Sequence, residues 1–479
     1  MLIIFRTLAA TLLLFFSLHT QAQQFARAYG GGGVENAYSV LQTADGGYVL
    51  AGFTESFGAG DRDFWVLRLD ASGSIVWQRA IGGSLTDTGL ELVQTTDGGF
   101  AVAGITFSFG AGSSEAWVVK LDAGGNLLWN RVIGNADADD FWGLAATSDG
   151  GVIAAGSTRP AGGTFDGWLV KLSSAGAVSW QRRYTGAGGD GFSQVRQTTD
   201  GGYVAVGYTN SFGAAWDLWV VKTDASGAIT WQRNYGGAGD DFANDVRQTT
   251  DGGYIVAGTT DSFGYGADDG WLLKLDASGN LTWQRSYGDA APASADGFYG
   301  VRQTSEGGYI VSGYTNIGST GSDDAWLMKL DGSGNITWQR AFGTSSFDYS
   351  TMVTQTADGG YALSGTTAGF GAGSNDAWLI KCDSGGNLGT CAMARAATAT
   401  TTVTAGASAA STATDPATIY ANSEAAATLT TTAATVFTIC AAAAAAVASA
   451  VPAISNLGLA LLMVLLGLLA VHRLRRANQ

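Results

Sequence analysis

One short motif recurs seven times and constrains the fold of most of this chain. An acidic residue and two glycines, usually followed by an aromatic residue, return at intervals of 51 to 55 residues. The acidic residues of the seven copies are Asp45, Asp97, Asp149, Asp200, Asp251, Glu306 and Asp358. Seven copies in matched register indicate an array of equivalent units that bury their hydrophobic faces against one another.

Each unit contains four short runs with the pattern of β-strands, as residues 246–288 illustrate. VRQT and YIVAGTT flank the Asp-Gly-Gly turn, and GWLLKLD and LTWQRSY flank a second turn at residues 276–280. The runs are rich in β-branched and aromatic residues and alternate with period two. Glycines in both turns allow the positive φ of tight hairpins. The sequence therefore predicts an all-β fold, a seven-bladed β-propeller of four-stranded antiparallel blades over residues 23–396. A solenoid of β-strands is the alternative.

The first residues of the body indicate how the ring closes. Residues 25–30 (FARAYG) match residues 77–82 (WQRAIG), whereas the seventh unit has no copy of this run after Leu388. We expect the N-terminal strand to complete the last blade, which removes the free edges of the sheet. Deleting residues 25–29 is therefore expected to lower stability sharply.

Tryptophan follows the same period. Thirteen of the 15 tryptophans fall into two series with one member per blade, which indicates a role in the core between blades. The series are Trp65, Trp117, Trp168, Trp219, Trp271, Trp326 and Trp378, and Trp77, Trp129, Trp180, Trp231, Trp283 and Trp338. Trp142 and Trp216 fall outside both series.

Charged residues also recur once per unit, and a residue needed in every blade serves folding. Short aspartates cap turns through backbone N–H groups, and we expect the basic residues to pair with them between strands. One acidic series is Glu35, Asp87, Asp139, Asp190, Asp241, Asp296 and Asp348, and another is Asp63, Glu115, Asp166, Asp217, Asp269, Asp324 and Asp376. The basic series are Arg68, Lys120, Lys171, Lys222, Lys274, Lys329 and Lys381, and Arg27, Arg79, Arg131, Arg182, Arg233, Arg285 and Arg340.

Composition excludes several classes of function. The only histidines, His19 and His472, lie in the terminal segments, so the body cannot carry catalysis or metal sites that depend on imidazole. The net charge of −15 disfavours binding to nucleic acid. The three cysteines have no zinc-binding spacing. A pair between Cys391 and Cys440 would tie the C-terminal segment to the propeller, a pair between Cys382 and Cys391 would staple the last blade, and the sequence leaves both open.

Residues 1–22 have the parts of a secretory signal peptide. Arg6 supplies an early positive charge, an apolar run extends from Leu8 to Leu18, and Thr20 and Ala22 are small residues before the expected cleavage point. A buried core helix is the alternative. The sequence predicts an exported protein.

The C-terminal end is expected to act as an anchor. Residues 397–450, rich in alanine, threonine and serine, read as a flexible stalk. Within residues 451–479, an apolar run from Leu457 to Val471 precedes three arginines, a layout that keeps the tip cytoplasmic and the body outside. We expect this segment to form a transmembrane helix with a basic tail.

The same segment resembles the C-terminal sorting signals of Gram-negative bacteria, the IPTL and PEP-CTERM types. The positions that carry the resemblance are Val451, Pro452, Ala453, Ile454 and Gly458, and Leu457 stands where such signals have tryptophan. The resemblance implies cleavage by an exosortase-like membrane transpeptidase. The body would then be passed to the cell surface after transient anchoring in the inner membrane, and a permanent single-span anchor is the alternative.

The repeat itself resembles the DGGY-type β-propeller repeat proteins that bacteria and archaea secrete as surface proteins. The motifs that carry the resemblance are QTxDGGY, SFGAG, DxWLxKLD and WQRxYG, and it covers residues 25 to about 391. It implies a propeller and a surface location but no shared chemistry.

Residues that break the repeat indicate where a specific site lies. In a propeller, the long loops between strands two and three and between blades share one face, which the sequence predicts to be acidic and to be the binding face. Repeat-breaking residues expected there are Arg62, Trp142, Arg159, Trp216 and Tyr265. Aromatic residues with arginine suit a protein or polysaccharide partner.

Two classes of function follow from this face. The favoured one is a non-catalytic binding or structural module at the cell surface, and the alternative is a glycan-cleaving enzyme that uses a carboxylate pair. No catalytic residue and no cofactor are expected. Calcium is the one alternative, on carboxylate doublets such as Asp240-Asp241, Asp268-Asp269 and Asp323-Asp324.

Overall fold

The computed structural model describes residues 24–213, 215–264, 267–288, 295–317 and 322–389, together with six short strands between residues 394 and 441. Every regular element in these ranges is a β-strand. Within them, no helix has the length and apolar character that crossing a membrane requires. The predicted signal peptide at residues 1–22 and the predicted sorting segment at residues 451–479 lie outside the described residues.

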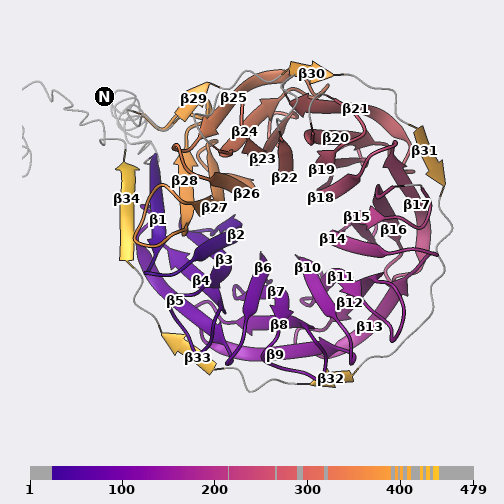
Figure 1. Cartoon of the computed structure of the whole chain (residues 1–479), viewed down its shortest axis with the longest axis horizontal. Coiled ribbons are helices and arrows are strands. Elements are labelled where there is room, and N and C mark those ends of the chain that lie inside the picture. Colours follow the sequence, from indigo (N-terminus) through magenta and orange to yellow (C-terminus); the bar gives the residue numbers. More distant parts are fainter. Residues whose placement is uncertain are drawn as a thin grey trace, which may run out of the picture. The chain divides into compact units, whose positions relative to one another are not determined.

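Seven antiparallel sheets form the blades of a closed propeller, which confirms the predicted architecture (Figure 1). The inner strands, nearest the axis, are β2 (Glu35–Gln42), β6 (Asp87–Gln94), β10 (Asp139–Ala146), β14 (Asp190–Gln197), β18 (Asp241–Gln248), β22 (Gly297–Gln303) and β26 (Asp348–Gln355). The second strands are β3 (Tyr48–Thr54), β7 (Phe100–Thr106), β11 (Val152–Thr158), β15 (Tyr203–Thr209), β19 (Tyr254–Thr260), β23 (Tyr309–Thr315) and β27 (Tyr361–Thr367).

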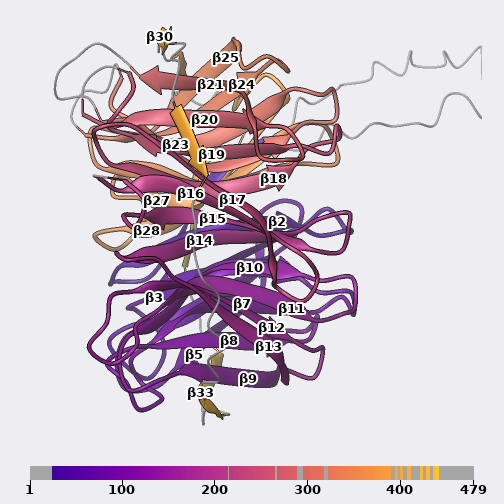
Figure 2. The same cartoon turned by 90° about the vertical axis from the view of Figure 1, so that its right-hand side faces the viewer.

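The outer half of each blade follows the same order. The third strands are β4 (Asp63–Leu69), β8 (Glu115–Leu121), β12 (Asp166–Leu172), β16 (Asp217–Thr223), β20 (Asp269–Leu275), β24 (Asp324–Leu330) and β28 (Asp376–Cys382). The fourth strands are β5 (Ile75–Gly82), β9 (Leu127–Gly134), β13 (Val178–Tyr184), β17 (Ile229–Gly236), β21 (Leu281–Gly288), β25 (Ile336–Phe342) and, in the last blade, β1 (Phe25–Gly30). The strands run between the two faces of the ring, as the view turned by 90° shows (Figure 2).

The N-terminal strand closes the ring as the sequence predicts. β1 pairs antiparallel with β28, with Ala28 opposite Trp378. Phe25 and Tyr29 of this strand are completely buried, and the Tyr29 hydroxyl donates a hydrogen bond to the Gly73 carbonyl of the first blade at 2.7 Å. The last blade is therefore built from both ends of the propeller sequence.

A repeated contact joins each outer strand to the next blade, and Trp231 illustrates it. Its ring lies so close to Gly279 that a Cβ there would come within 2.6 Å of it, and its indole N–H donates to the Ala277 carbonyl at 3.2 Å. Gly279 has a φ of +77°, which favours glycine. Tryptophans of the other predicted series, such as Trp219, are completely buried between blades. Both series therefore lie at blade interfaces.

The recurring charges are structural, although one series differs from expectation. Each residue of the basic series that begins with Arg68 forms an ion pair with the acidic residue of the Asp-Gly-Gly turn in its own blade, for example Lys120 with Asp97 at 3.0 Å. The outer arginines were expected to pair with aspartates as well. In the described residues most of them donate to backbone carbonyls, as Arg79 does to Gly125 at 2.9 Å, whereas Arg27 donates to the Ser74 hydroxyl at 3.4 Å.

Short strands are also described in and just before the alanine- and threonine-rich segment, residues 397–450, for which a stalk is expected. Six short strands extend the outer edges of six blades, in reverse blade order: β29 (Ala394–Ala396), β30 (Thr400–Thr402), β31 (Ala407–Ala410), β32 (Ala421–Ser423), β33 (Thr428–Thr431) and β34 (Thr435–Ala441). They appear in orange and yellow around the ring in Figure 1. Strand pairing uses backbone groups, so a segment without an alternating side-chain pattern can still cover the exposed edges.

Candidate ligand-binding site in the axial cavity

Every inner strand carries a β-bulge at the same position. In each blade the bulge lies three residues after the buried member of the first acidic series, for example Glu35 in the first blade. One residue of the inner strand is thereby left out of the pairing with the second strand. The seven bulged residues are Tyr38, Leu90, Trp142, Ser193, Asn244, Tyr299 and Thr351. All seven blades thus share the bulge, but the bulged residue varies between blades, and only tyrosine occurs twice.

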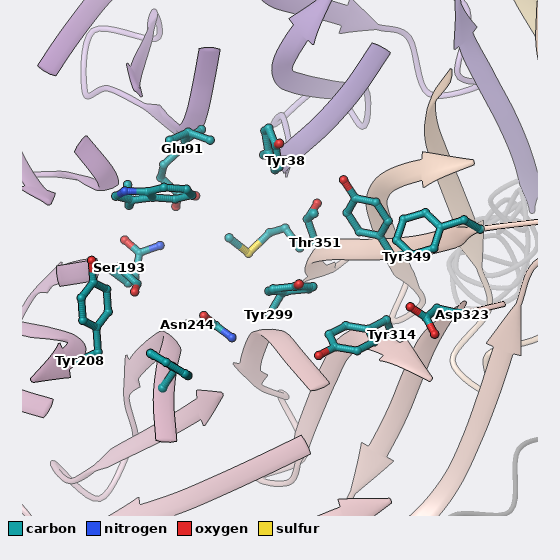
Figure 3. Close-up of a pocket in the computed structure, with 16 residues that line it drawn as sticks. Tyr38, Glu91, Ser193, Tyr208, Asn244, Tyr299, Tyr314, Asp323, Tyr349 and Thr351 are labelled. Atoms are coloured by element: carbon teal, nitrogen blue, oxygen red, sulfur yellow. The ribbon is translucent and has the colours of Figure 1, made fainter. Parts of the chain in front are cut away.

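All seven bulged residues line one cavity of about 600 Å³ on the axis of the ring. Further aromatic residues complete its wall: Tyr208, Phe242, Tyr314, Phe347 and Tyr349. Figure 3 shows side chains from separate blades surrounding this space, which we call the axial cavity. It is open to ligand, because Trp142 is 46% and Tyr299 is 36% exposed.

The tyrosines of the sixth and seventh blades form a connected aromatic wall. The ring centroid of Tyr299 lies 5.5 Å from that of Tyr314 and 6.5 Å from that of Tyr349. Burial raises the pKa of Tyr299 to about 12, and burial also raises the pKa of Tyr349. The hydroxyls are therefore neutral at ordinary pH and can both donate and accept hydrogen bonds.

Two carboxylates reach the axial cavity, and their surroundings differ. Glu91 of β6 pairs with Arg196 at 3.0 Å. Asp323 lies just before β24, and burial raises its pKa. Figure 3 places the two on opposite sides of the cavity. A third carboxylate, Asp140, lies two residues before the bulged Trp142, and burial raises its pKa to about 6 while the hydroxyl and N–H of Ser157 oppose that rise.

A second cavity of about 560 Å³, here called the rim groove, adjoins the axial cavity. Tyr208 and Phe242 line both, so the two spaces share a wall. The rim groove brings together two residues expected from the sequence, Arg159 and Trp216. The Trp216 ring lies 5.4 Å from Tyr208 edge to face, and the Arg159 guanidinium lies 5.8 Å from the Phe165 ring.

The other residues expected at the binding face are distributed differently. Trp142 lies in the axial cavity rather than in the rim groove. Arg62 pairs with Glu55 at 2.6 Å and covers the ring of Phe53 at 4.0 Å, so a structural contact explains it. Tyr265 lies outside the described residues. The other six bulged residues were not predicted, although the sequence shows that this repeat position varies between blades.

The two acidic series do not make the face acidic, because all of their members are buried. Asp241, for example, is 0% exposed and accepts hydrogen bonds from Ser262 Oγ at 2.6 Å and the Gly237 N–H at 3.0 Å. Asp217, with 6%, is the most exposed of the fourteen. Within the described residues, no group of three or more histidine, cysteine, aspartate or glutamate side chains forms a metal site. These carboxylates instead hold the loops that form the rim.

The predicted cysteine pairs depend largely on residues that are not described. Cys391 lies outside the described residues, and Cys440 is described only through its backbone pairing with Ala26 in β1. The Cys382 thiol is free and completely buried, and burial raises its pKa to about 12.

Comparison with known proteins adds little to this picture. No family model matches the chain. Regulatory protein FlaEY of Caulobacter vibrioides is 24% identical over 399 residues, which cover 70% of this chain and 41% of that protein. The chain thus matches less than half the length of this curated relative.

Solved structures with a related shape are distant. A protein of unknown function from Bacteroides caccae is 12% identical, covers 61% of this chain and 92% of its own, and has a TM-score of 0.35. Sqt1 from Chaetomium thermophilum is 13% identical, with coverage of 71% and 82% and a TM-score of 0.40. Puromycin hydrolase, as an S511A mutant with PGG, is 15% identical, with coverage of 79% and 54% and a TM-score of 0.42. Likeness at this level carries no argument about function.

Proposed function

We propose that this protein is a non-catalytic binding module for polysaccharide, with the axial cavity as its main site and the rim groove as an extension. The observation that supports it best is the convergence of seven bulged residues, which vary between blades, on one aromatic-lined cavity. The rest of the repeat is needed to build the ring, so variation at this position is free to serve a ligand.

The chemistry of the two cavities favours sugar over other ligands. Flat aromatic faces such as those of Trp142 and Tyr299 pack against the apolar faces of sugar rings, and neutral hydroxyl and amide groups bind sugar hydroxyls. Ser193 and Asn244 supply such groups within the same wall. The shared wall of Tyr208 and Phe242 would let a chain of several sugar units pass from the axis to the rim.

The carboxylates support binding without turnover. Glycoside hydrolases of the usual two-carboxylate kind hold both groups within roughly 5 to 10 Å of each other across the scissile bond. In the axial cavity, Glu91 is engaged by Arg196, and Asp323 lies on the opposite side (Figure 3). Glu91 belongs to the second blade and Asp323 to the sixth, and neither of these blades contributes another carboxylate to the described lining of the axial cavity.

We also propose that binding takes place outside the cytoplasm of a Gram-negative bacterium. The signal-peptide pattern of residues 1–22 and the sorting-signal pattern of residues 451–479 support export and delivery to the cell surface. An envelope or matrix polysaccharide is the ligand class available there.

A glycan array that includes bacterial envelope polysaccharides tests this function. We expect saturable binding of wild type that is lost in Trp142→Ala and kept in Phe107→Ala. Phe107 is a suitable control because it is 48% exposed yet lines neither the axial cavity nor the rim groove. Equal binding by both variants would contradict the proposed site. Release of reducing ends that stops in Asp323→Asn would instead establish the enzyme alternative.

A further inference from the structure

Three arginines gather in a further cavity of about 510 Å³, farther along the inner strands and nearer the Asp-Gly-Gly hairpins. Arg196, Arg247 and Arg302 occupy the same repeat position, six residues after the buried acid, in blades four, five and six. The other blades have uncharged residues there, namely Leu41, Val93, Ala145 and Thr354. The positive charge is therefore confined to one arc of the channel, and we call this space the arginine cavity.

Two acids only partly balance these three arginines. Asp245, completely buried, lies 3.3 Å from Arg196 and 2.5 Å from Arg302, and Glu91 lies 3.0 Å from Arg196. Two carboxylates against three guanidiniums leave one positive charge in excess. Glu91 lines both the arginine cavity and the axial cavity, so the two spaces adjoin at this residue.

Arg247 is the least satisfied of the three. Arg196 also donates to the Leu144 carbonyl at 2.8 Å, and Arg302 to the Val301 carbonyl at 2.7 Å. The contact of Arg247 is an ion pair of 3.4 Å between its Nε and Asp245, and among the described residues this buried nitrogen has no hydrogen-bond partner. The side chain is 22% exposed.

The electrostatics of the cluster indicate which ligand is missing. Burial, together with the neighbouring charges of Arg196 and Arg302, lowers the pKa of Arg247 well below its usual range. Burial opposes ionisation of Asp245, but the three arginines outweigh it and hold the pKa of this acid below its usual value. The pKa of Asp245 is already lowered by the arginines, and an added anion would compensate the positive charge that the two carboxylates leave unbalanced.

We propose that the arginine cavity binds an oxyanion, a carboxylate, sulfate or phosphate group, with Arg247 as its main ligand and Arg196 and Arg302 beside it. The planar guanidinium matches the geometry of oxyanions and binds them through paired hydrogen bonds. The proposal does not depend on the polysaccharide site, since the three arginines line the arginine cavity and are not among the residues that line the axial cavity.

Thermal melts of the full chain test the site with sodium acetate, sulfate and phosphate, each against sodium chloride at equal ionic strength. We expect at least one oxyanion to raise the melting temperature saturably. In Arg247→Gln the concentration at half effect should rise at least tenfold, and in the control Arg62→Gln it should not change. The responding salt shows which oxyanion chemistry the site takes. A response no larger than that to chloride, or the same response in Arg247→Gln, would overturn the proposal.

The melting temperature without added oxyanion separates this role from a structural one. Because three guanidiniums face two carboxylates, removing the excess positive charge should leave Arg247→Gln at least as stable as wild type at low salt. A purely structural arginine would instead destabilise the protein on removal, with no change in the response to anions. If Arg247→Gln fails to fold, Arg247→Lys decides: a raised half-effect concentration supports the site, and an unchanged one rejects it.

Discussion

Ring closure by the N-terminal strand can be tested with a single substitution, Phe25→Ala. Phe25 stands where the other blades have tryptophan, and its ring packs against the first-blade turn so closely that a Cβ at Gly73 would lie 2.7 Å from it. Its centroid also lies 6.2 Å from the Tyr48 ring. The side chain is therefore shared between the last blade and the first.

The expected cost follows from complete burial of this side chain. Removing a fully buried phenylalanine destabilises a protein by about 3 to 5 kcal/mol through lost burial and the cavity that remains. That is a large part of a typical unfolding free energy of about 5 to 15 kcal/mol. Since β1 pairs with β28 of the last blade and its Phe25 packs against the first blade, we expect the loss to affect the whole propeller.

Urea denaturation monitored by tryptophan fluorescence and by circular dichroism measures this effect. Phe25→Ala should lower the midpoint strongly for both probes, whereas Val76→Ala, at a position that is 60% exposed on β5, should stay within about 0.5 kcal/mol of wild type. If Phe25→Ala were as stable as Val76→Ala, the closure argument would be wrong.

Two further predictions concern the turns and the buried acids. Gly279→Ala should destabilise more than Gly252→Ala in urea melts, because both have positive φ but only Gly279 faces a ring, that of Trp231; equal losses would show that backbone strain alone matters. Stability should rise as pH falls from about 7 to 5, because burial raises the pKa of Asp63 and of Asp376 to about 6. The folded state therefore binds these protons more tightly than the unfolded state, and the stability that they contribute is lost as pH rises through about 6. It should fall again in stronger acid, because the Thr95 hydroxyl and Lys120 hold the pKa of Asp97 at about 2; melting temperatures that only decline below pH 7 would contradict this.

The ring could be predicted from the sequence because the residues that make its structural contacts recur in every repeat. The spacing of the Asp-Gly-Gly turns determines the blades, and the run Phe25–Gly30 indicates closure through its match to a fourth strand. The carbonyl partner of Arg79 could not be predicted, because the sequence does not show that the carbonyls of the next blade's turn lie beside this outer arginine.

The binding cavity is harder to predict because it depends on the bulges. In a strand that alternates strictly, the face on which Trp142 or Tyr299 lies would follow from counting every second residue. The extra residue of a bulge changes which side chain faces the axis. In the sequence, Arg196, Arg247 and Arg302 look like ordinary members of the repeat, because they occupy one repeat position in three consecutive blades. Only the fold shows that they share one channel.

The C-terminal strands could not be predicted from side-chain patterns. The residues of β30 (TTT) and β31 (ASAA) have no alternation of polar and apolar side chains, and their pairing is through the backbone. The unpaired edges of the outer strands, rather than the sequence of the added segment, make such pairing favourable.

Isothermal titration with an oligosaccharide selected from the glycan array tests the central claim most directly. We predict that Trp142→Ala and Tyr299→Ala each weaken binding at least tenfold, and that Phe107→Ala keeps the dissociation constant within about twofold, since tenfold corresponds to about 1.4 kcal/mol of lost contact. Unchanged affinity in both cavity variants would contradict the assignment of the axial cavity as the binding site.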